Sequence, residues 1–178
     1  NLVWAPVGGF ESISLLANWG IAASEPGEGA SLYKAVMALN TLLDELGISI
    51  NGGKDSMSMA AKVDWQNEKR MVKAPGTLVI TAYSACPDIT RTITPDIKQP
   101  GRSRLMFIDL SGGSSRLGGS ALAQVYSQAG HEAPDVDDPA LLRKGFEAVQ
   151  TLIKQNLVIA GHDRSDGGLI TCLLEMAF

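Results

Sequence analysis

The stretch Gly52–Ser56 (GGKDS) combines residue types that bind phosphate groups. Lys54 supplies a cation, Ser56 supplies a hydroxyl donor, and Asp55 can hold a metal ion or a hydroxyl group. The two glycines let a ligand approach the backbone closely. The same residues also favour an ordinary solvated β-turn, because Gly, Asp and Ser dominate turns for conformational reasons. The stretch is not a P-loop, since the GxxxxGK[ST] spacing is absent.

A second polar stretch, Ala160–Leu169 (AGHDRSDGGL), lies where a predicted strand ends and a predicted helix begins. Ligands and anions bind at such places in α/β folds. Asp163 and Ser165 supply hard oxygen atoms of the kind that Mg²⁺ prefers, and we expect Asp163 to be a metal ligand. Asp166 can instead cap the following helix, which is the role we favour for it. His162 has the chemistry of a general base, although a structural hydrogen bond is the favoured interpretation.

The remaining reactive residues indicate less. Ser111–Gln124 is a third glycine-rich loop before a helix, and it is a weak candidate for an anion nest. Cys86 and Cys172 have neither a CxxC spacing nor a nucleophile elbow, so we expect both to be reduced and buried. His131 and His162 are too few and too isolated to predict a classical zinc cluster.

The elements that position the first stretch follow from its flanking patterns. Apolar residues at spacings of three and four predict an amphipathic helix over Ser31–Leu46, with Ser31 as N-cap and Gly47 as the stop. We expect the last two of the following β runs to pair antiparallel, with GGKDS as a charged turn. The three predicted β runs are Ile48–Ile50, Met57–Val63 and Thr77–Tyr83.

The prolines, glycine and scattered charges of Thr94–Arg104 predict a boundary between two lobes. Before it the pattern is α+β, and beyond it strands and helices alternate as in an α/β lobe. The elements predicted there are strand Leu105–Leu110, helix Gly119–Gln128, helix Pro139–Gln155, strand Leu157–Ala160 and a final helix from Leu169.

The composition excludes several classes of protein. Of the 178 residues, 45% are hydrophobic and 19% are charged, and the net charge is -4. This acidic balance argues against a general nucleic-acid surface, which needs clustered Lys and Arg. No apolar run reaches the roughly 20 residues of a membrane span, and the first residues show no basic segment followed by an apolar core and a cleavage site, so we expect a cytoplasmic location. Both ends read as cuts, so we expect a piece of a longer protein.

Four long motifs together resemble the phosphoribosylformylglycinamidine synthase family, in its long single-chain form. They are NGGKDSMSM, VKAPGTLVITAYSACPDITRTITPD, RLGGSALAQVYSQAG and GHDRSDGGLITCLLEMAF. The opening NLVWAPV and the later ANW match as well, so the resemblance covers essentially the whole chain.

This resemblance implies an ATP-dependent ligase of purine biosynthesis. Such enzymes convert formylglycinamide ribonucleotide to its amidine, with ammonia from glutamine released in a separate glutaminase domain. The substrate amide is first phosphorylated by ATP, and ammonia then displaces phosphate. The fold implied is that of aminoimidazole ribonucleotide synthetase. Residues 1–96 would be the later part of its sheet-forming lobe, and residues 97–178 the start of its α/β lobe.

The resemblance also implies roles for particular residues. Gly53, Lys54 and Ser56 would face ATP and the ribonucleotide phosphate, with Lys54 and Ser56 in catalytic positions. Asn1 and Asp163 would bind magnesium, and Ser165 would contact the nucleotide of a second, auxiliary site. Shorter members carry Asn and Val at positions 54 and 55, so the individual roles of those two residues stay open.

Two other functions stay open. The chain could be a non-catalytic nucleotide-binding or packing module that stabilises a larger parent protein. It could also come from a related synthetase of the same fold, although those relatives lack GGKDSMSM and ACPDIT. The expected partners are formylglycinamide ribonucleotide, ATP or ADP, and the remaining synthetase and glutaminase domains of the same chain, with no nucleic acid and no membrane.

Overall fold

The computed structural model describes residues 1–178, and these divide into two compact units. One unit is Phe10–Ser84, and the other joins Asn1–Gly9 to Ala85–Phe178. The first nine residues therefore belong with the C-terminal part of the chain. The assignment of residues 1–96 and 97–178 to two synthetase subdomains remains a prediction.

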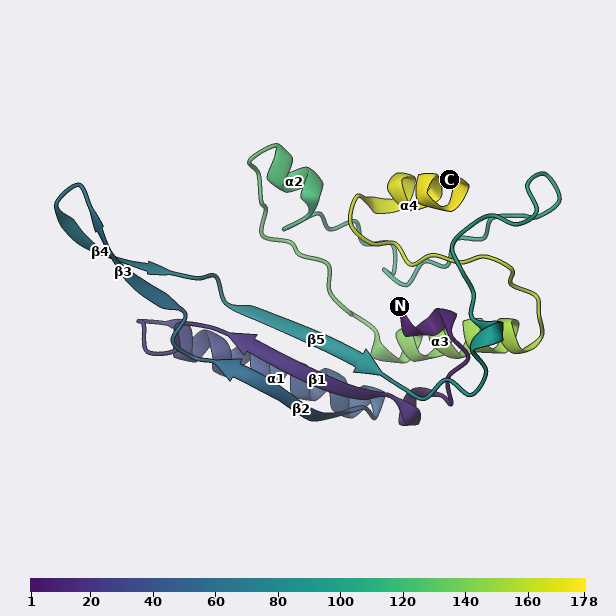
Figure 1. The fold of residues 1–178 in the computed structure, drawn as a ribbon, viewed down its shortest axis with the longest axis horizontal. Coiled ribbons are helices and arrows are strands. Elements are labelled where there is room, and N and C mark those ends of the chain that lie inside the picture. Colours follow the sequence, from purple (N-terminus) through teal and green to yellow (C-terminus); the bar gives the residue numbers. More distant parts are fainter. The chain divides into compact units, whose positions relative to one another are not determined.

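The unit Phe10–Ser84 contains a three-stranded mixed sheet in the order β2-β1-β5 (Figure 1). Strand β1 pairs parallel with β2 and antiparallel with β5, and helix α1 makes the crossover between the parallel pair. The elements are β1 (Ser14–Gly20), α1 (Glu28–Leu46), β2 (Ser49–Ser56) and β5 (Thr77–Tyr83).

The helix predicted from residue 31 begins three residues earlier. Its N-cap is Gly27, so the prediction of Ser31 as N-cap is wrong. Ser31 instead lies inside the helix, where its hydroxyl donates to the Gly27 carbonyl oxygen at 3.1 Å. Gly47 ends the helix in the left-handed conformation, as predicted, because glycine adopts this conformation without a Cβ clash.

The GGKDS stretch is not a turn, and this corrects the prediction. Strand β2 runs through it to Ser56, because residues 52–56 pair in register with residues 16–20 of β1. The register shifts once, between Leu15 and Leu16, so that Asn51 is an extra residue on β2. Turn-like composition is overridden here by pairing with a strand that lies far away in sequence.

The expected antiparallel pairing of residues 57–63 with residues 77–83 is also wrong. Strand β3 (Ala60–Trp65) pairs with β4 (Glu68–Lys73) in a separate two-stranded hairpin, whereas β5 pairs with β1. Gln66 and Asn67 both have positive φ, which suits the two-residue turn of a tight hairpin.

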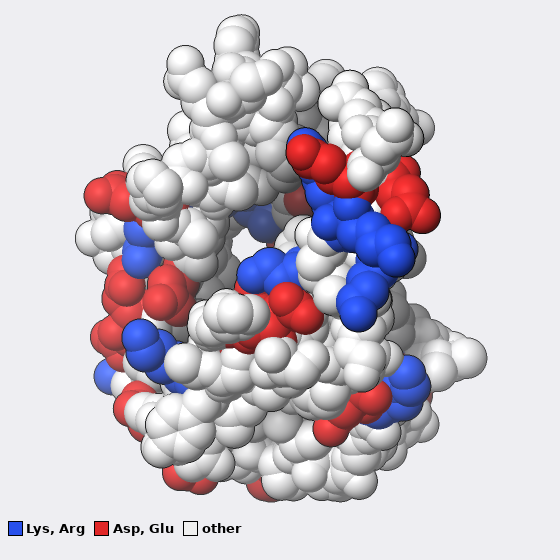
Figure 2. All heavy atoms as spheres, turned by 90° about the vertical axis from the view of Figure 1, so that its left-hand side faces the viewer, with Lys and Arg blue, Asp and Glu red and all other residues white.

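Charges of both signs lie on the face drawn in Figure 2. Blue Lys and Arg side chains lie beside red Asp and Glu side chains there, so the face is neither wholly positive nor wholly negative.

The other unit is built from helices and long connections. Its α-helices are α2 (Ala121–Val125), α3 (Pro139–Lys154) and α4 (Gly168–Ala177). The predicted strands Leu105–Leu110 and Leu157–Ala160 are not formed, because neither has a ladder partner among residues 1–178. Most of their apolar side chains are exposed, and the Leu110 side chain lies against Gly145 of α3.

Helix α3 carries the polar contacts that hold this unit together. The side chain of Gln150 is buried and bonds three backbone groups: it accepts from Val7 N at 3.2 Å and donates to Val3 O at 2.7 Å and Ala5 O at 2.9 Å. Arg91 donates to the carbonyl oxygens of Ile153 and Lys154, which gives these two carbonyl groups at the end of α3 a hydrogen-bond partner.

None of the helices among residues 1–178 has the length and apolar character that a membrane span requires.

The tight approach of β2 to β1 generates a stability prediction. A Cβ at Gly53 would lie 1.8 Å from the carbonyl oxygen of Ala17, which belongs to the paired backbone and cannot move alone. We expect Gly53→Ala to lower the free energy of unfolding by about 1–3 kcal/mol or more, as measured by urea denaturation. The control is Gly20→Ala in β1, where a Cβ would meet only Met59 at 3.9 Å. If both variants are equally stable, the close approach of the two strands is wrong.

Candidate functional site

The first candidate group lies at the carboxyl end of the parallel pair β1 and β2. Lys54 and Ser56 are two residues apart on β2, so both side chains project from the same face. The Lys54 ammonium donates to the Ser56 hydroxyl at 2.5 Å. Lys54 is exposed, whereas the backbone of Ser56 is held by Ile21, whose N–H donates to its carbonyl oxygen at 2.9 Å. A cation and a hydroxyl are thus presented together on a fixed strand.

Gly53 has a structural role of its own. It is paired with Ala17, and the absence of a Cβ is what lets the two backbones approach. A ligand is not needed to explain this glycine.

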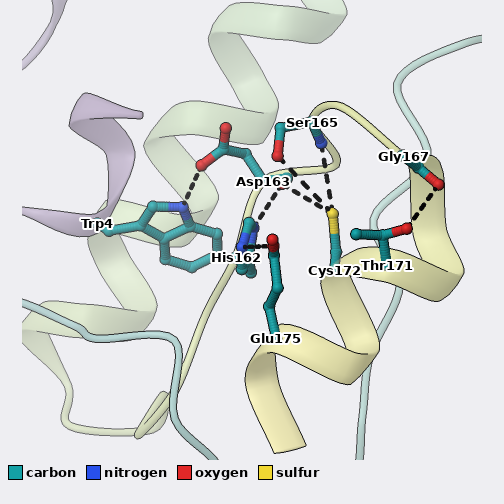
Figure 3. Close-up of polar contacts among 8 residues, drawn as sticks. All are labelled: Trp4, His162, Asp163, Ser165, Gly167, Thr171, Cys172 and Glu175. Atoms are coloured by element: carbon teal, nitrogen blue, oxygen red, sulfur yellow. Dashed lines mark hydrogen bonds and ion pairs between the residues drawn. The ribbon is translucent and has the colours of Figure 1, made fainter. Parts of the chain in front are cut away.

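The second candidate group lies in residues 160–168, which lead into α4. Figure 3 shows the Asp163 carboxylate pointing toward Trp4 and the Ser165 hydroxyl pointing toward Cys172. Trp4 Nε1 donates to Asp163 Oδ1 at 3.2 Å, and Ser165 Oγ lies 3.9 Å from Cys172 Sγ. The two predicted ligand residues therefore point in different directions.

Trp4 connects the predicted metal residues Asn1 and Asp163. Its backbone N–H donates to Asn1 O at 3.3 Å, while its indole donates to Asp163. Its ring lies on Gly161, where a Cβ would come within 2.1 Å of Trp4 Cζ3. Trp4 was not among the predicted site residues, because its contacts with Gly161 and Asp163 join residues far apart in the sequence and no local pattern reveals them.

Asp166 does not cap α4, so this prediction is wrong. The N-cap is Gly167 in the left-handed conformation, with no side-chain hydrogen bond to the helix. Thr171 strengthens the turn instead, because its hydroxyl donates to the Gly167 carbonyl oxygen at 2.9 Å. Cys172 is buried as expected, whereas Cys86 is half-buried. His162 makes hydrogen bonds in a structural setting, to the Asp163 carbonyl and to Glu175.

The third loop is a poor anion site. Arg116 forms a bidentate ion pair with Asp137, with Arg116 Nη1 at 3.2 Å from Asp137 Oδ1. The hollow beside it is also lined by Glu132 and Asp135, so carboxylates outnumber the single arginine. An anion entering this hollow would meet net negative charge.

Residues 107–109 are linked to the second candidate group. The guanidinium of Arg164 lies 5.7 Å from the ring centroid of Phe107, within cation–π range. The pKa of Asp109 lies below its ordinary value, mainly because Ser111 donates side-chain and backbone hydrogen bonds to it, with a smaller contribution from Arg164. Arg164 therefore faces residues 107–109.

Known families match both parts of the chain. Residues 1–85 match the FGAR-AT PurM_N-like domain, and residues 108–178 match the C-terminal domain of AIR synthase related proteins. The mixed α/β structure with small sheets agrees with a fold of the AIR synthase type. Residues 86–107 lie between the two matches, and they include Thr94–Arg104, the predicted boundary between lobes.

Relatives that align with the whole of this chain agree with these matches. The chain is 54% identical over 179 residues to a probable phosphoribosylformylglycinamidine synthase, chloroplastic/mitochondrial, of Arabidopsis thaliana. It is 51% identical to the phosphoribosylformylglycinamidine synthase of Homo sapiens and 47% identical to that of Dictyostelium discoideum. These alignments cover 99–100% of the chain but only 12–13% of each relative. By its sequence along its whole length, the chain belongs to the phosphoribosylformylglycinamidine synthase family.

Proposed function

We propose that the chain is part of an ATP-dependent ligase that converts formylglycinamide ribonucleotide and ammonia to formylglycinamidine ribonucleotide. The observation that carries this proposal is the identity of about half of all positions to phosphoribosylformylglycinamidine synthases over the whole chain. The ammonia would come from glutamine in a glutaminase domain elsewhere in the same protein. A sheet-forming lobe followed by an α/β lobe is the arrangement that we propose for residues 1–96 and 97–178.

Lys54 and Ser56 are proposed to act on the phosphates of ATP and the ribonucleotide. In the reaction, the substrate amide oxygen attacks the γ-phosphorus and ADP leaves, after which ammonia attacks the amide carbon and phosphate leaves. Charge develops on the transferred phosphoryl oxygens, and a fixed cation stabilises it most when it is already in place. The hydrogen bond from Lys54 to Ser56 supports this role, because it restricts the ammonium before substrate arrives.

The donor atoms of the other unit fit a hard cation. Asp163 offers a carboxylate, Asn1 an amide oxygen and Ser165 a hydroxyl, and oxygen donors of this kind suit Mg²⁺. We propose that Asp163 and Asn1 hold Mg²⁺ and that Ser165 contacts a nucleotide of an auxiliary site. The ion, when bound, supplies charge neutralisation for phosphate oxygens. Trp4 is proposed to orient Asp163, because its indole fixes one of the two carboxylate oxygens.

A non-catalytic nucleotide-binding or packing role is the second candidate. The observation in its favour is that Asp163 and Ser165 lie in a unit other than the one that holds Lys54 and Ser56. The following experiments separate these two functions.

The cytoplasmic location also remains a prediction. The Arabidopsis relative is named chloroplastic/mitochondrial.

Replacing Lys54 tests the catalytic role. Lys54→Ala removes a charge-assisted contact worth about 1.5–3 kcal/mol, so ammonia-dependent turnover of the full-length enzyme should fall roughly tenfold to a hundredfold. Ser56→Ala should lower turnover in the same direction, because the hydroxyl positions the ammonium. The double variant should lose less than the product of the two single losses, since the residues act as one unit.

The matched control is Lys62→Ala, an exposed lysine on β3, which should keep near-normal turnover. Using ammonia as the nitrogen donor removes any dependence on glutamine hydrolysis. Full activity of both Lys54→Ala and Ser56→Ala would contradict the catalytic role and favour the non-catalytic module.

Replacing Asp163 tests the metal role. Asp163→Asn keeps the shape of the side chain and a carbonyl-type acceptor for Trp4 but removes the negative charge. In the full-length protein it should reduce the bound nucleotide and lower the melting temperature, because a ligand that binds only the folded state stabilises it. Nucleotide release on denaturation and thermal unfolding, with and without added Mg²⁺ and ADP, measure the two effects.

Two further variants separate ligand binding from packing. Asp64→Asn on the exposed hairpin controls for the loss of one charge and should change neither measurement. Trp4→Phe keeps an aromatic ring over Gly161 but removes the indole donor, so it should weaken nucleotide binding less than Asp163→Asn. A melting temperature that falls in Asp163→Asn by the same amount with and without Mg²⁺ and ADP would rule out the auxiliary site.

A further inference from the structure

Three side chains of different chemistry meet beside the start of α4. His162 comes from the preceding loop, and Cys172 and Glu175 lie three positions apart on α4, which puts them on one face of the helix. One ligand atom from each, a ring nitrogen, a sulfur and a carboxylate oxygen, all lie within 4.8 Å of one another. Figure 3 shows the imidazole beside the Glu175 carboxylate, with the sulfur of Cys172 directed to the same loop. The function proposed above uses none of these three residues.

The two ring nitrogens of His162 face different oxygen atoms. Nδ1 lies 2.6 Å from the carbonyl oxygen of Asp163, and because a carbonyl oxygen only accepts, Nδ1 carries a hydrogen. Nε2 lies 2.9 Å from Glu175 Oε2, on the side of the ring that also faces Cys172. With the hydrogen on Nδ1, Nε2 is the ring nitrogen that can bind a metal ion.

Cys172 completes the group of possible metal ligands. Its thiol is buried, and the sulfur lies close to both His162 and Glu175. The backbone N–H of Ser165 donates to Cys172 Sγ at 3.4 Å, and the same sulfur lies 3.5 Å from the carbonyl oxygen of Asp163, so the sulfur is held beside the loop that carries His162. Metal-binding histidines commonly donate their other ring N–H to a carbonyl group, as His162 does.

We propose that His162 Nε2, Cys172 Sγ and the Glu175 carboxylate bind a zinc-class divalent metal ion. A nitrogen, a thiolate and a carboxylate are the ligand set of Zn²⁺, which leaves one position of a tetrahedral site for water. Glu175 is half-exposed and opens this position to solvent. The ion is of a different class from the one proposed at Asp163, because Mg²⁺ prefers oxygen donors alone. The metal would tie the loop that carries Asp163 and Ser165 to helix α4.

Cobalt is a suitable probe, because thiolate-bound Co²⁺ absorbs light where other cobalt sites do not. The full-length protein is stripped of metal and titrated with Co²⁺ in excess Mg²⁺, which occupies sites made only of oxygen donors. The wild type should show thiolate-to-cobalt absorption that Zn²⁺ abolishes. Cys172→Ala should lose this band, whereas Cys86→Ala, the other cysteine of the chain, should keep it.

Glu175→Gln guards against a folding defect, because it changes a half-exposed side chain and keeps its shape. It should weaken Zn²⁺ binding by at least the roughly tenfold to hundredfold that loss of an outer partner of a metal site costs. No ATP or substrate is present, so the result does not depend on the proposed function. An unchanged cobalt band in Cys172→Ala, or equal Zn²⁺ affinity of the wild type and Glu175→Gln, would overturn the proposal.

Discussion

The indole of Trp4 joins parts of the chain that lie far apart in sequence. Its ring occupies the space that a side chain at Gly161 would fill, and its N–H donates to Asp163. The backbone carbonyl oxygen of Trp4 accepts from Ile93 N at 2.8 Å, so the segment that follows β5 is also bonded to Trp4. The position of the Asp163 carboxylate therefore depends on a residue about 160 positions earlier in the chain. A substitution of Trp4 would therefore change the surroundings of Asp163, the candidate metal ligand, while leaving its carboxylate in the protein.

Single side chains replace sheet hydrogen bonds in the unit that contains Trp4. The buried amide of Gln150 satisfies three backbone groups of the N-terminal segment, and leaving such groups unpaired would cost about 1–3 kcal/mol each. Arg91 does the same for the end of α3, and Asp138 caps its start by accepting from Leu141 N. The N-terminal turn is thus fixed to α3 by polar contacts that no hydrophobic pattern reveals.

Local patterns predicted the elements that depend on local interactions. The helices at residues 28–46, 139–154 and 168–177 were found, because the apolar spacing that predicts them lies within each segment, although the predicted caps Ser31 and Asp166 were wrong. Strand β5 was found with its observed bounds, yet its partner was wrong, since pairing depends on residues elsewhere. The missed strand β1 has buried residues at Leu15 and Ala17 only, too short an alternation to identify alone.

The candidate site shows the same division. Residue types predicted that Lys54 and Ser56 face phosphate groups, which stays a prediction, and they predicted a turn where a paired strand is formed. The turn was predicted because glycine is common in turns. In the structure, Gly53 instead lets the backbones of β1 and β2 approach closely. For Asp163, the oxygen-donor chemistry could be read directly, whereas its orientation could not, because Trp4 determines it.

The loop before α4 has two chemically different sides. Asp163 turns its carboxylate to Trp4, while its own carbonyl oxygen accepts from His162 Nδ1. The same residue thus contacts the indole of Trp4 through its side chain and the imidazole of His162 through its backbone. Because Trp4 and His162 hold different atoms of one residue, Asp163 links the N-terminal segment to the polar group beside α4.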